Sequence, residues 1–114
     1  MPSARALCIA LVCFAPAACA QKITPSYESP EPGARNAAIV STAARGDMRD
    51  IPQLVRMLDS DDPTTRVLAI RTLERLTGQT FGYDPHAEAF EREASIERWA
   101  GLVREQAAAK GARP

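Results

Sequence analysis

The feature that most constrains the fold is a segment carrying every signal of a complete α-helix, residues 62–76 with the sequence DPTTRVLAIRTLERL. Asp62 can accept hydrogen bonds from the free N–H groups of the first turn, and Pro63 suits the first helical position, where no N–H is needed. Gly78 readily adopts the left-handed conformation that ends many helices. Apolar side chains between these signals recur at helical spacing: Ala69, Ile70, Leu73 and Leu76. The segment is therefore predicted to form one helix with a buried face.

Two further helices are predicted before this one. Residues 33–45 are rich in alanine, follow a proline and end at Gly46. Residues 48–59 follow a possible capping residue, Asp47, and carry the clearest apolar stripe of the chain, with Pro52 near the first turn. The stripe consists of Ile51, Leu54, Val55 and Leu58. Because only a few residues separate this helix from the next, the two are expected to run antiparallel.

An aromatic loop and a final helix are predicted after Leu76. Residues 77–84 contain two glycines, and Phe81 and Tyr83 are expected to pack against the preceding helices. Asp84 and Pro85 repeat the cap-and-proline signal, so a last helix is predicted over about 87–108. Its inward residues would be Ile96, Trp99, Ala100 and Val103, flanked by Leu102 and Phe90.

The first 20 residues have the pattern of an export signal. Arg5 gives a positive start, residues 6–15 are apolar, and small residues follow. The apolar run is too short to cross a membrane as a helix. Cys8 and Cys13 would be removed with the signal, so only Cys19 could remain and no disulfide within the mature chain is expected.

Cys19 leaves two processing routes open. Ala17-Ala18-Cys19 resembles a bacterial lipobox, whose cysteine receives a lipid, although Pro16 stands where that motif usually has an aliphatic residue. Acylation would explain a lone remaining thiol, and we favour this route. Alternatively, Ala18 and Ala20 satisfy the rule for cleavage after Ala20, which would release a soluble exported protein. The proline-rich segment 21–32 is predicted to be an extended linker.

The chain also contains an internal repeat of 31 residues. Residues 29–39 align with residues 60–70, with identical residues at Ser29 and Ser60, Arg35 and Arg66, and further matched positions at proline, alanine and isoleucine. A weaker third copy covers residues 88–102, where Arg92, Ser95, Ile96, Trp99 and Leu102 take the places of Arg66, Ala69, Ile70, Leu73 and Leu76. Repeats of this length that contain two helices are typical of α-solenoids.

Residues 47–76 resemble one bacterial HEAT repeat of the type first associated with phycobilisome lyases. The features that carry the resemblance are Ile51-Pro52-x-Leu54-Val55-x-x-Leu58, the turn 59–63, and Arg66-x-x-Ala69-Ile70-x-x-Leu73. Thr65 departs from the valine that is usual before the arginine. The resemblance implies an all-α fold, a short α-solenoid of about four helices grouped in antiparallel pairs, and a role in protein–protein interaction. The alternative is an accessory protein of the lyase-type family that handles a small ligand or pigment.

The charged and reactive residues give no sign of catalysis. The chain has 14 Lys and Arg against 14 Asp and Glu, so it lacks the basic surface of a nucleic-acid binder. His86 is the only histidine, and we predict that Asp84 caps a helix beside it rather than forming a catalytic pair. No catalytic residue, cofactor or metal ligand is predicted. Arg66 points toward the interior and should therefore be paired with Asp62, Asp47 or loop carbonyls.

Taken together, the predicted organisation is an export signal over 1–20, a linker over 21–32, a helical domain over 33–109 and a frayed tail over 110–114. The expected protein lies on the periplasmic side of a bacterial membrane, held only by the lipid on Cys19. It binds a protein partner whose identity the sequence does not give. Because so short a solenoid is close to the lower size limit for a stable core, homodimerisation is a further hypothesis.

Overall fold

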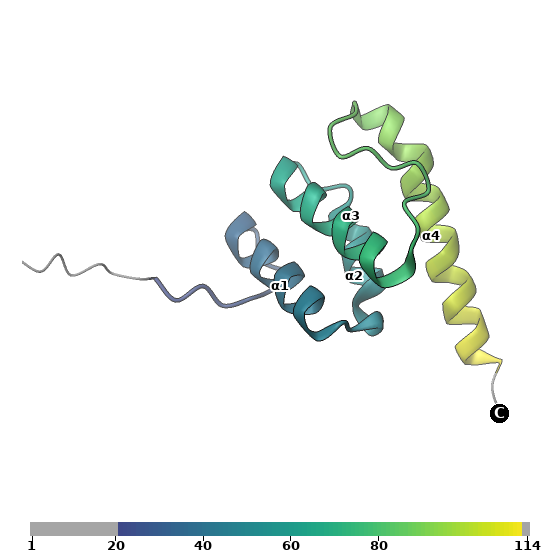
Figure 1. The fold of residues 1–114 in the computed structure, drawn as a ribbon, viewed down its shortest axis with the longest axis horizontal. Helices are drawn as coiled ribbons and strands as arrows, with labels where there is room; N and C mark the ends of the chain where they lie inside the picture. The colour runs from purple at the N-terminus through teal and green to yellow at the C-terminus, as the bar shows by residue number, and fades with distance from the viewer. Residues whose placement is uncertain (1–20, 113–114) are drawn as a thin grey trace, which may run out of the picture.

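The computed structural model describes residues 21–112, and all of their regular structure is helical, as the sequence predicts. The predicted export signal and Cys19 lie outside the described residues. The elements are α1 (Pro32–Arg45), the 3₁₀ turn η1 (Met48–Asp50), α2 (Ile51–Met57), α3 (Pro63–Thr77) and α4 (Ala89–Gly111). Figure 1 shows α1, α3 and α4 from left to right, with α2 behind α3.

The predicted start and stop signals of α3 are confirmed. The Asp62 side chain accepts hydrogen bonds from the backbone N–H of Thr65 at 2.9 Å and from its hydroxyl at 2.7 Å. Gly78 ends the helix with a φ of +74°, and its N–H donates to the Glu74 carbonyl. Gly46 ends α1 in the same left-handed region, with a φ of +62°. At both positions an L side chain would be strained, so glycine is the residue best suited to end these helices.

The helix predicted over 48–59 is shorter than expected. Residues 48–50 form a 3₁₀ turn, and regular α-helix covers only Ile51–Met57. Pro52 has no N–H to donate to the carbonyl four residues before it, and that carbonyl, of Met48, instead accepts from the N–H of Ile51. At the other end, hydrogen bonds of the tighter three-residue type lead the chain out of the helix.

Both predicted ends of the last helix were wrong by a few residues. The Asp84 side chain accepts from the N–H of His86 at 2.8 Å and stabilises a local turn instead of a helix start. Helix α4 begins at Ala89, where Glu88 and Glu91 form a reciprocal capping box. It continues to Gly111, so Lys110 belongs to the helix and not to a frayed tail.

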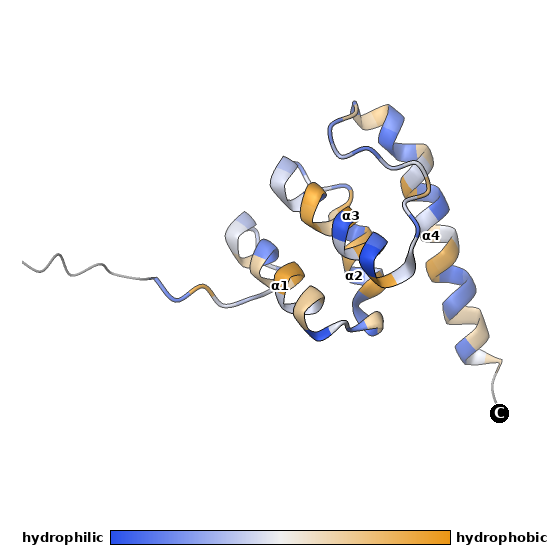
Figure 2. Cartoon of the chain, in the orientation of Figure 1, coloured by the Kyte–Doolittle hydropathy of each residue, from blue (hydrophilic) through white to orange (hydrophobic). Residues whose placement is uncertain are grey.

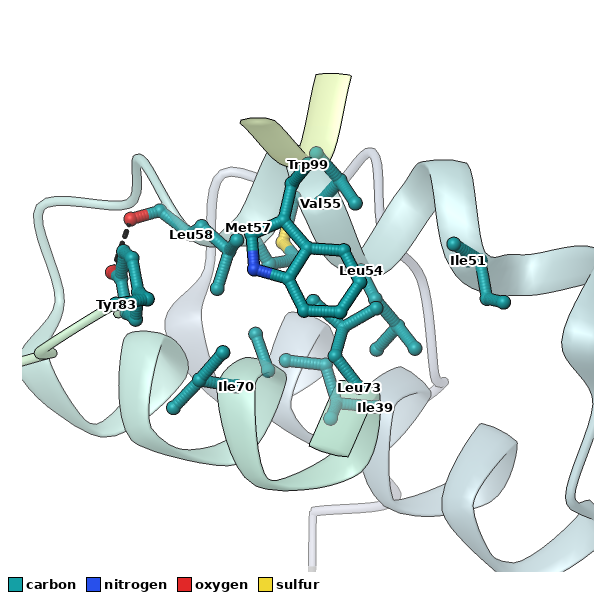
Figure 3. Close-up of a cluster of buried hydrophobic side chains, with 11 residues drawn as sticks. Ile39, Ile51, Leu54, Val55, Met57, Leu58, Ile70, Leu73, Tyr83 and Trp99 are labelled. Atoms are coloured by element: carbon teal, nitrogen blue, oxygen red, sulfur yellow. Dashed lines mark hydrogen bonds between the residues drawn. The ribbon is translucent and has the colours of Figure 1, made fainter. Parts of the chain in front are cut away.

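The helices share one hydrophobic core. Helix α3 packs against both α1 and α2, and α2 also packs against α4 (Figure 1). The apolar residues are gathered where these helices face one another, whereas α4 alternates between polar and apolar residues along its length (Figure 2). Core side chains come from every helix and from the loop before α4: Ile39, Ile51, Leu54, Val55, Met57, Leu58, Ala69, Ile70, Leu73, Tyr83 and Trp99 (Figure 3).

The loop between α3 and α4 is held against the core by its aromatic residues, as predicted. Trp99 is fully buried, and its indole N–H donates to the carbonyl of Thr80 at 3.1 Å. The ring of Phe81 meets the indole edge to face, with centroids 4.7 Å apart. Tyr83 is buried, and its hydroxyl donates to the carbonyl of Leu58 at 2.5 Å (Figure 3). These contacts tie the loop to both α2 and α4.

The predicted linker contacts the helical domain through its second half. Ser26 donates its N–H to the carbonyl of Ala34, and Tyr27 is half-buried against α1. Pro32 is the first residue of α1. Contact with the domain therefore begins before Gly33, because the ring of Tyr27 packs against α1 and its hydroxyl forms a hydrogen bond with that helix.

Candidate interaction surface

The arginines of the internal repeat occupy equivalent positions in three helices. Arg66 donates to the carbonyls of Ser60 at 2.8 Å, Asp61 at 3.2 Å and Pro85 at 3.0 Å. The sequence suggested Asp62, Asp47 or loop carbonyls as partners of Arg66. In the structure the partners are loop carbonyls, and neither of these aspartates is bonded to Arg66. A guanidinium carries five donors in a fixed plane, which allows one side chain to hold several carbonyls of the same loop.

The other two copies repeat this contact. Arg35 donates to the carbonyls of Ser29 and Pro30, each at 2.9 Å, and these residues stand six and five positions before it, as Ser60 and Asp61 stand before Arg66. Arg92 donates to the carbonyl five positions before it, that of Ala87, at 2.6 Å. We call these three contacts the arginine clamps. The third is the least complete, because the buried Nε of Arg92 has no hydrogen-bond partner among residues 21–112.

A polar network joins the N-terminal segment to the first helix and to η1. Thr42 is fully buried, and its hydroxyl donates to Asp50 at 2.7 Å. The Tyr27 hydroxyl therefore donates to Thr42, at 2.5 Å, and Arg45 approaches the same Asp50 carboxylate at 3.1 Å. Burial raises the pKa of Tyr27 above 10.0, so its hydroxyl stays protonated at neutral pH. This network secures Tyr27 against α1.

The sequence did not single out Asp50 or the contact between α1 and α3. There the Thr65 hydroxyl, which donates to Asp62, lies 2.6 Å from the amide oxygen of Asn36, across the two helices. Thr65 stands where the repeat pattern quoted above usually has valine, and its hydroxyl lies within hydrogen-bond distance of both Asn36 and the capping Asp62. Such pairs between distant residues leave no signal in a single sequence.

The residues considered for chemistry have structural contacts. Asp84 and His86 are both exposed. The Asp84 carboxylate accepts a hydrogen bond from the backbone N–H of His86 and not from its imidazole. Glu88 and Glu91 cap α4, and Glu97 lies 3.8 Å from Arg104. Within residues 21–112, no group of three or more His, Cys, Asp or Glu side chains is placed to hold a metal ion.

The surface of residues 21–112 has several hollows, and three of them differ in the chemistry of their walls. One, of about 420 Å³, lies beside the N-terminal segment and contains the ion pair of Arg56 and Glu28, whose atoms are 2.6 Å apart. A second, of about 300 Å³, lies between η1 and the end of α4 and is bordered by Met48, Arg49, Ile51, Gln106, Ala109 and Lys110. Both have at least one basic side chain in their walls.

The third hollow differs in chemistry and lies beside the first two turns of α4. It measures about 430 Å³, and its walls are Asp59, Ala89, Phe90, Glu93, Ile96 and Glu97. We call it the Phe90 groove. The Phe90 side chain is 73% exposed, although it was predicted only to flank the inward stripe of the helix. Its walls combine apolar and acidic side chains, and a hollow that offers both kinds of contact can bind a partner.

No helix within residues 21–112 is both long and apolar enough to cross a bilayer. No family model matches the sequence, and no curated protein or solved structure shows significant similarity to the chain.

Proposed function

We propose that this chain is a non-catalytic interaction module of the HEAT-repeat type. The observation that carries the proposal is the recurrence of the arginine clamp in α1, α3 and α4. In a solenoid, each unit is a copy of its neighbour and makes the same local contacts, so a contact repeated at equivalent positions is expected. The loop carbonyls at the start of each unit would then be fixed by an arginine in the helix that follows.

The buried positions of the three helices support the same assignment. Counting from each clamp arginine, the third residue is buried in every copy, and the seventh is fully buried in every copy. The first set is Ala38, Ala69 and Ser95, and the second is Thr42, Leu73 and Trp99. Helices α2 and α3 pack together across the connection 58–62, which fits one antiparallel pair.

In this proposal both ends of the stack are closed without a full helix pair. The segment around Tyr27 lies on α1 where a preceding helix would lie, and the aromatic loop around Tyr83 takes the place of the first helix of the last unit. Terminal units of solenoids need such covers, because the apolar face of an end unit has no neighbour. The exposed helix faces between the covers are then available for a partner.

We further propose that the chain is exported and held on the periplasmic side of a bacterial membrane by a lipid on Cys19. The argument is the sequence Ala17-Ala18-Cys19 after an apolar run, followed by a proline-containing segment. If Tyr27 is fixed on α1, the free tether is short, and a segment of about seven residues spans at most roughly 20–25 Å. The domain would therefore stay close to the membrane surface.

Two experiments test these two parts separately. Mass spectrometry of the mature chain from a bacterial membrane fraction is expected to find a lipid-modified Cys19 at the N-terminus, and the Cys19→Ala variant is expected to lose the membrane association. A mature chain that begins at Gln21 would disprove the lipid anchor on Cys19, but it would not contradict the proposed interaction function. Affinity capture from the same cells is expected to enrich a protein partner, and a co-purified pigment or small ligand would instead favour the accessory role.

A further inference from the structure

We propose that the Phe90 groove binds a short segment of a partner protein in which an apolar side chain stands next to lysine or arginine. This inference rests on the proposed interaction function and names the surface and the chemistry of the partner. The groove lies between the start of α4 and the connection that follows α2, so both of its walls are fixed by the core.

The apolar part of the groove is Phe90 with Ile96. Phe90 is in the first turn of α4 and exposes 73% of its side chain, whereas Trp99 on the same helix is fully buried. Ile96 is half-buried and lies at the border of the core, so it continues the apolar surface inward. The hollow of about 430 Å³ is large enough to take one large apolar side chain of a partner.

The charged part of the groove is entirely acidic. Its walls carry the carboxylates of Asp59, Glu93 and Glu97 and no lysine or arginine. Within residues 21–112, Asp59 and Glu93 form no ion pair, and Glu97 meets Arg104 only at 3.8 Å with both side chains mostly exposed. Glu93 and Glu97 therefore remain available to attract a cation, whereas Asp59 also borders the first hollow, where Arg35 and Arg56 lie.

The arginines next to Glu93 and Glu97 in the sequence donate hydrogen bonds outside the groove. Arg92 donates to the carbonyl of Ala87, and Arg98 donates to the carbonyl of Phe81 at 3.0 Å, so both guanidinium groups are directed to the aromatic loop. Charge complementarity consequently favours a cationic segment. It disfavours a membrane surface, because anionic headgroups would be repelled by the same three carboxylates.

Besides Met48 next to Arg49, the chain itself carries an exposed segment with similar chemistry at Lys22 and Ile23, and Ile23 is 57% exposed. A second copy of the chain is therefore the competing occupant. The two occupants differ in a measurable way, since self-association through this segment would depend on Lys22 and Ile23 as well as on Phe90.

The test uses the full-length chain and three fluorescently labelled decapeptides, titrated by anisotropy. One contains leucine and lysine, the second has glutamate in place of lysine, and the third has serine in place of leucine. The leucine–lysine peptide is expected to bind at least about tenfold more tightly than either of the others, because only it supplies both parts of the proposed contact. Its affinity should also fall as salt increases.

Matched variants locate the site. Phe90→Ala is expected to weaken binding by about tenfold and Glu93→Gln by about threefold, as loss of a central aromatic contact and of one exposed charge pair should do. The controls are Val40→Ala, an exposed apolar residue of α1, and Glu105→Gln, an acidic residue of α4 outside the groove; both should change affinity by less than about twofold. Circular dichroism of each variant checks that the helices are retained.

Several results would overturn the inference. Equal binding of the glutamate peptide, or unchanged affinity in Phe90→Ala, would show that the groove is not the site. Binding to vesicles of anionic lipid that depends on Phe90 would identify a membrane contact instead. Dimerisation by sedimentation that is lost in both Phe90→Ala and Ile23→Ala would identify a second copy as the occupant. If a captured partner protein binds Phe90→Ala as well as it binds the natural chain, the module function stands and the groove assignment fails.

Discussion

Side chains that accept hydrogen bonds from backbone N–H groups mark where α3 and α4 begin. Asp62 is the clearest case, since its carboxylate accepts from both the N–H and the hydroxyl of Thr65. The hydroxyl and N–H of Thr65 hold the pKa of Asp62 below its usual value of 3.8. The ionised carboxylate is therefore the form that the folded chain favours.

We predict that Asp62→Ala lowers the free energy of unfolding by about 1 kcal/mol at pH 7, the usual cost of losing an N-terminal cap. Urea denaturation followed by circular dichroism measures it. Because the folded-state pKa is lowered, the contribution of the carboxylate is present above pH 4 and is lost as the pH falls through the folded-state pKa. The difference between the two proteins should therefore shrink as the pH falls below 3.8.

The neighbouring Asp61 provides the control. It is exposed, and its side chain makes no hydrogen bond within residues 21–112, so Asp61→Ala should change stability by less than about 0.5 kcal/mol. An equal loss in both variants would mean that general charge, and not the cap, stabilises the start of α3.

Local chemistry predicted such caps well in some places and poorly in others. The roles of Asp62 and Gly78 were predicted correctly because each needs only its immediate neighbours. The sequence around Asp84 has the same cap-and-proline form, yet the helix begins at Ala89. The difference lies in Tyr83, which is drawn into the core and fixes the direction of the chain just before Asp84.

Among the helices, the arginine clamps connect α1, α3 and α4 to the turns that lead into them. Arg66 donates the most hydrogen bonds of the three, because it binds two carbonyls of its own turn and one of the loop before α4. Arg35 holds carbonyls of one segment only. The two residues are equivalent in the repeat, but they differ in how many parts of the chain they join.

We predict that Arg66→Lys lowers the free energy of unfolding by about 1–2 kcal/mol, since an ammonium cannot reach three carbonyls in the geometry of a guanidinium. Arg35→Lys should cost less, about 0.5–1 kcal/mol, because fewer segments lose a contact. Arg71, which is exposed on α3 and makes no side-chain hydrogen bond within residues 21–112, is the control. Chemical denaturation of the three variants measures the order, and a loss in Arg71→Lys as large as that in Arg66→Lys would contradict it.

For the chain as a whole, Trp99 is the residue through which α4 joins the core. The indole lies where α4, α2 and the aromatic loop meet, and it is fully buried (Figure 3). Because it is the only tryptophan, its fluorescence reports this junction, whereas circular dichroism reports all the helices. The two signals together show whether α4 unfolds with the rest.

We predict that both signals follow one transition on thermal or chemical unfolding, because the core has no division between α4 and the other helices. Trp99→Ala should cost about 3–5 kcal/mol, enough to unfold much of a domain this small. The control on the same helix is Phe90→Ala, which removes an exposed ring and should change stability little. A fluorescence transition well before the loss of helix would contradict this prediction and mark α4 as a separate unit.

The amino-acid sequence by itself determined the helical class, the positions of most helices and the apolar residues that form the core. These features follow from side-chain periodicity and from capping chemistry, which act over a few neighbouring residues. The long-range arrangement required the three-dimensional structure: the partners of Arg66, the network of Tyr27 with Thr42 and Asp50, the true start of α4 and the exposed position of Phe90. Each of these depends on which distant backbone groups and side chains become neighbours after packing, and no local pattern in a single chain records that.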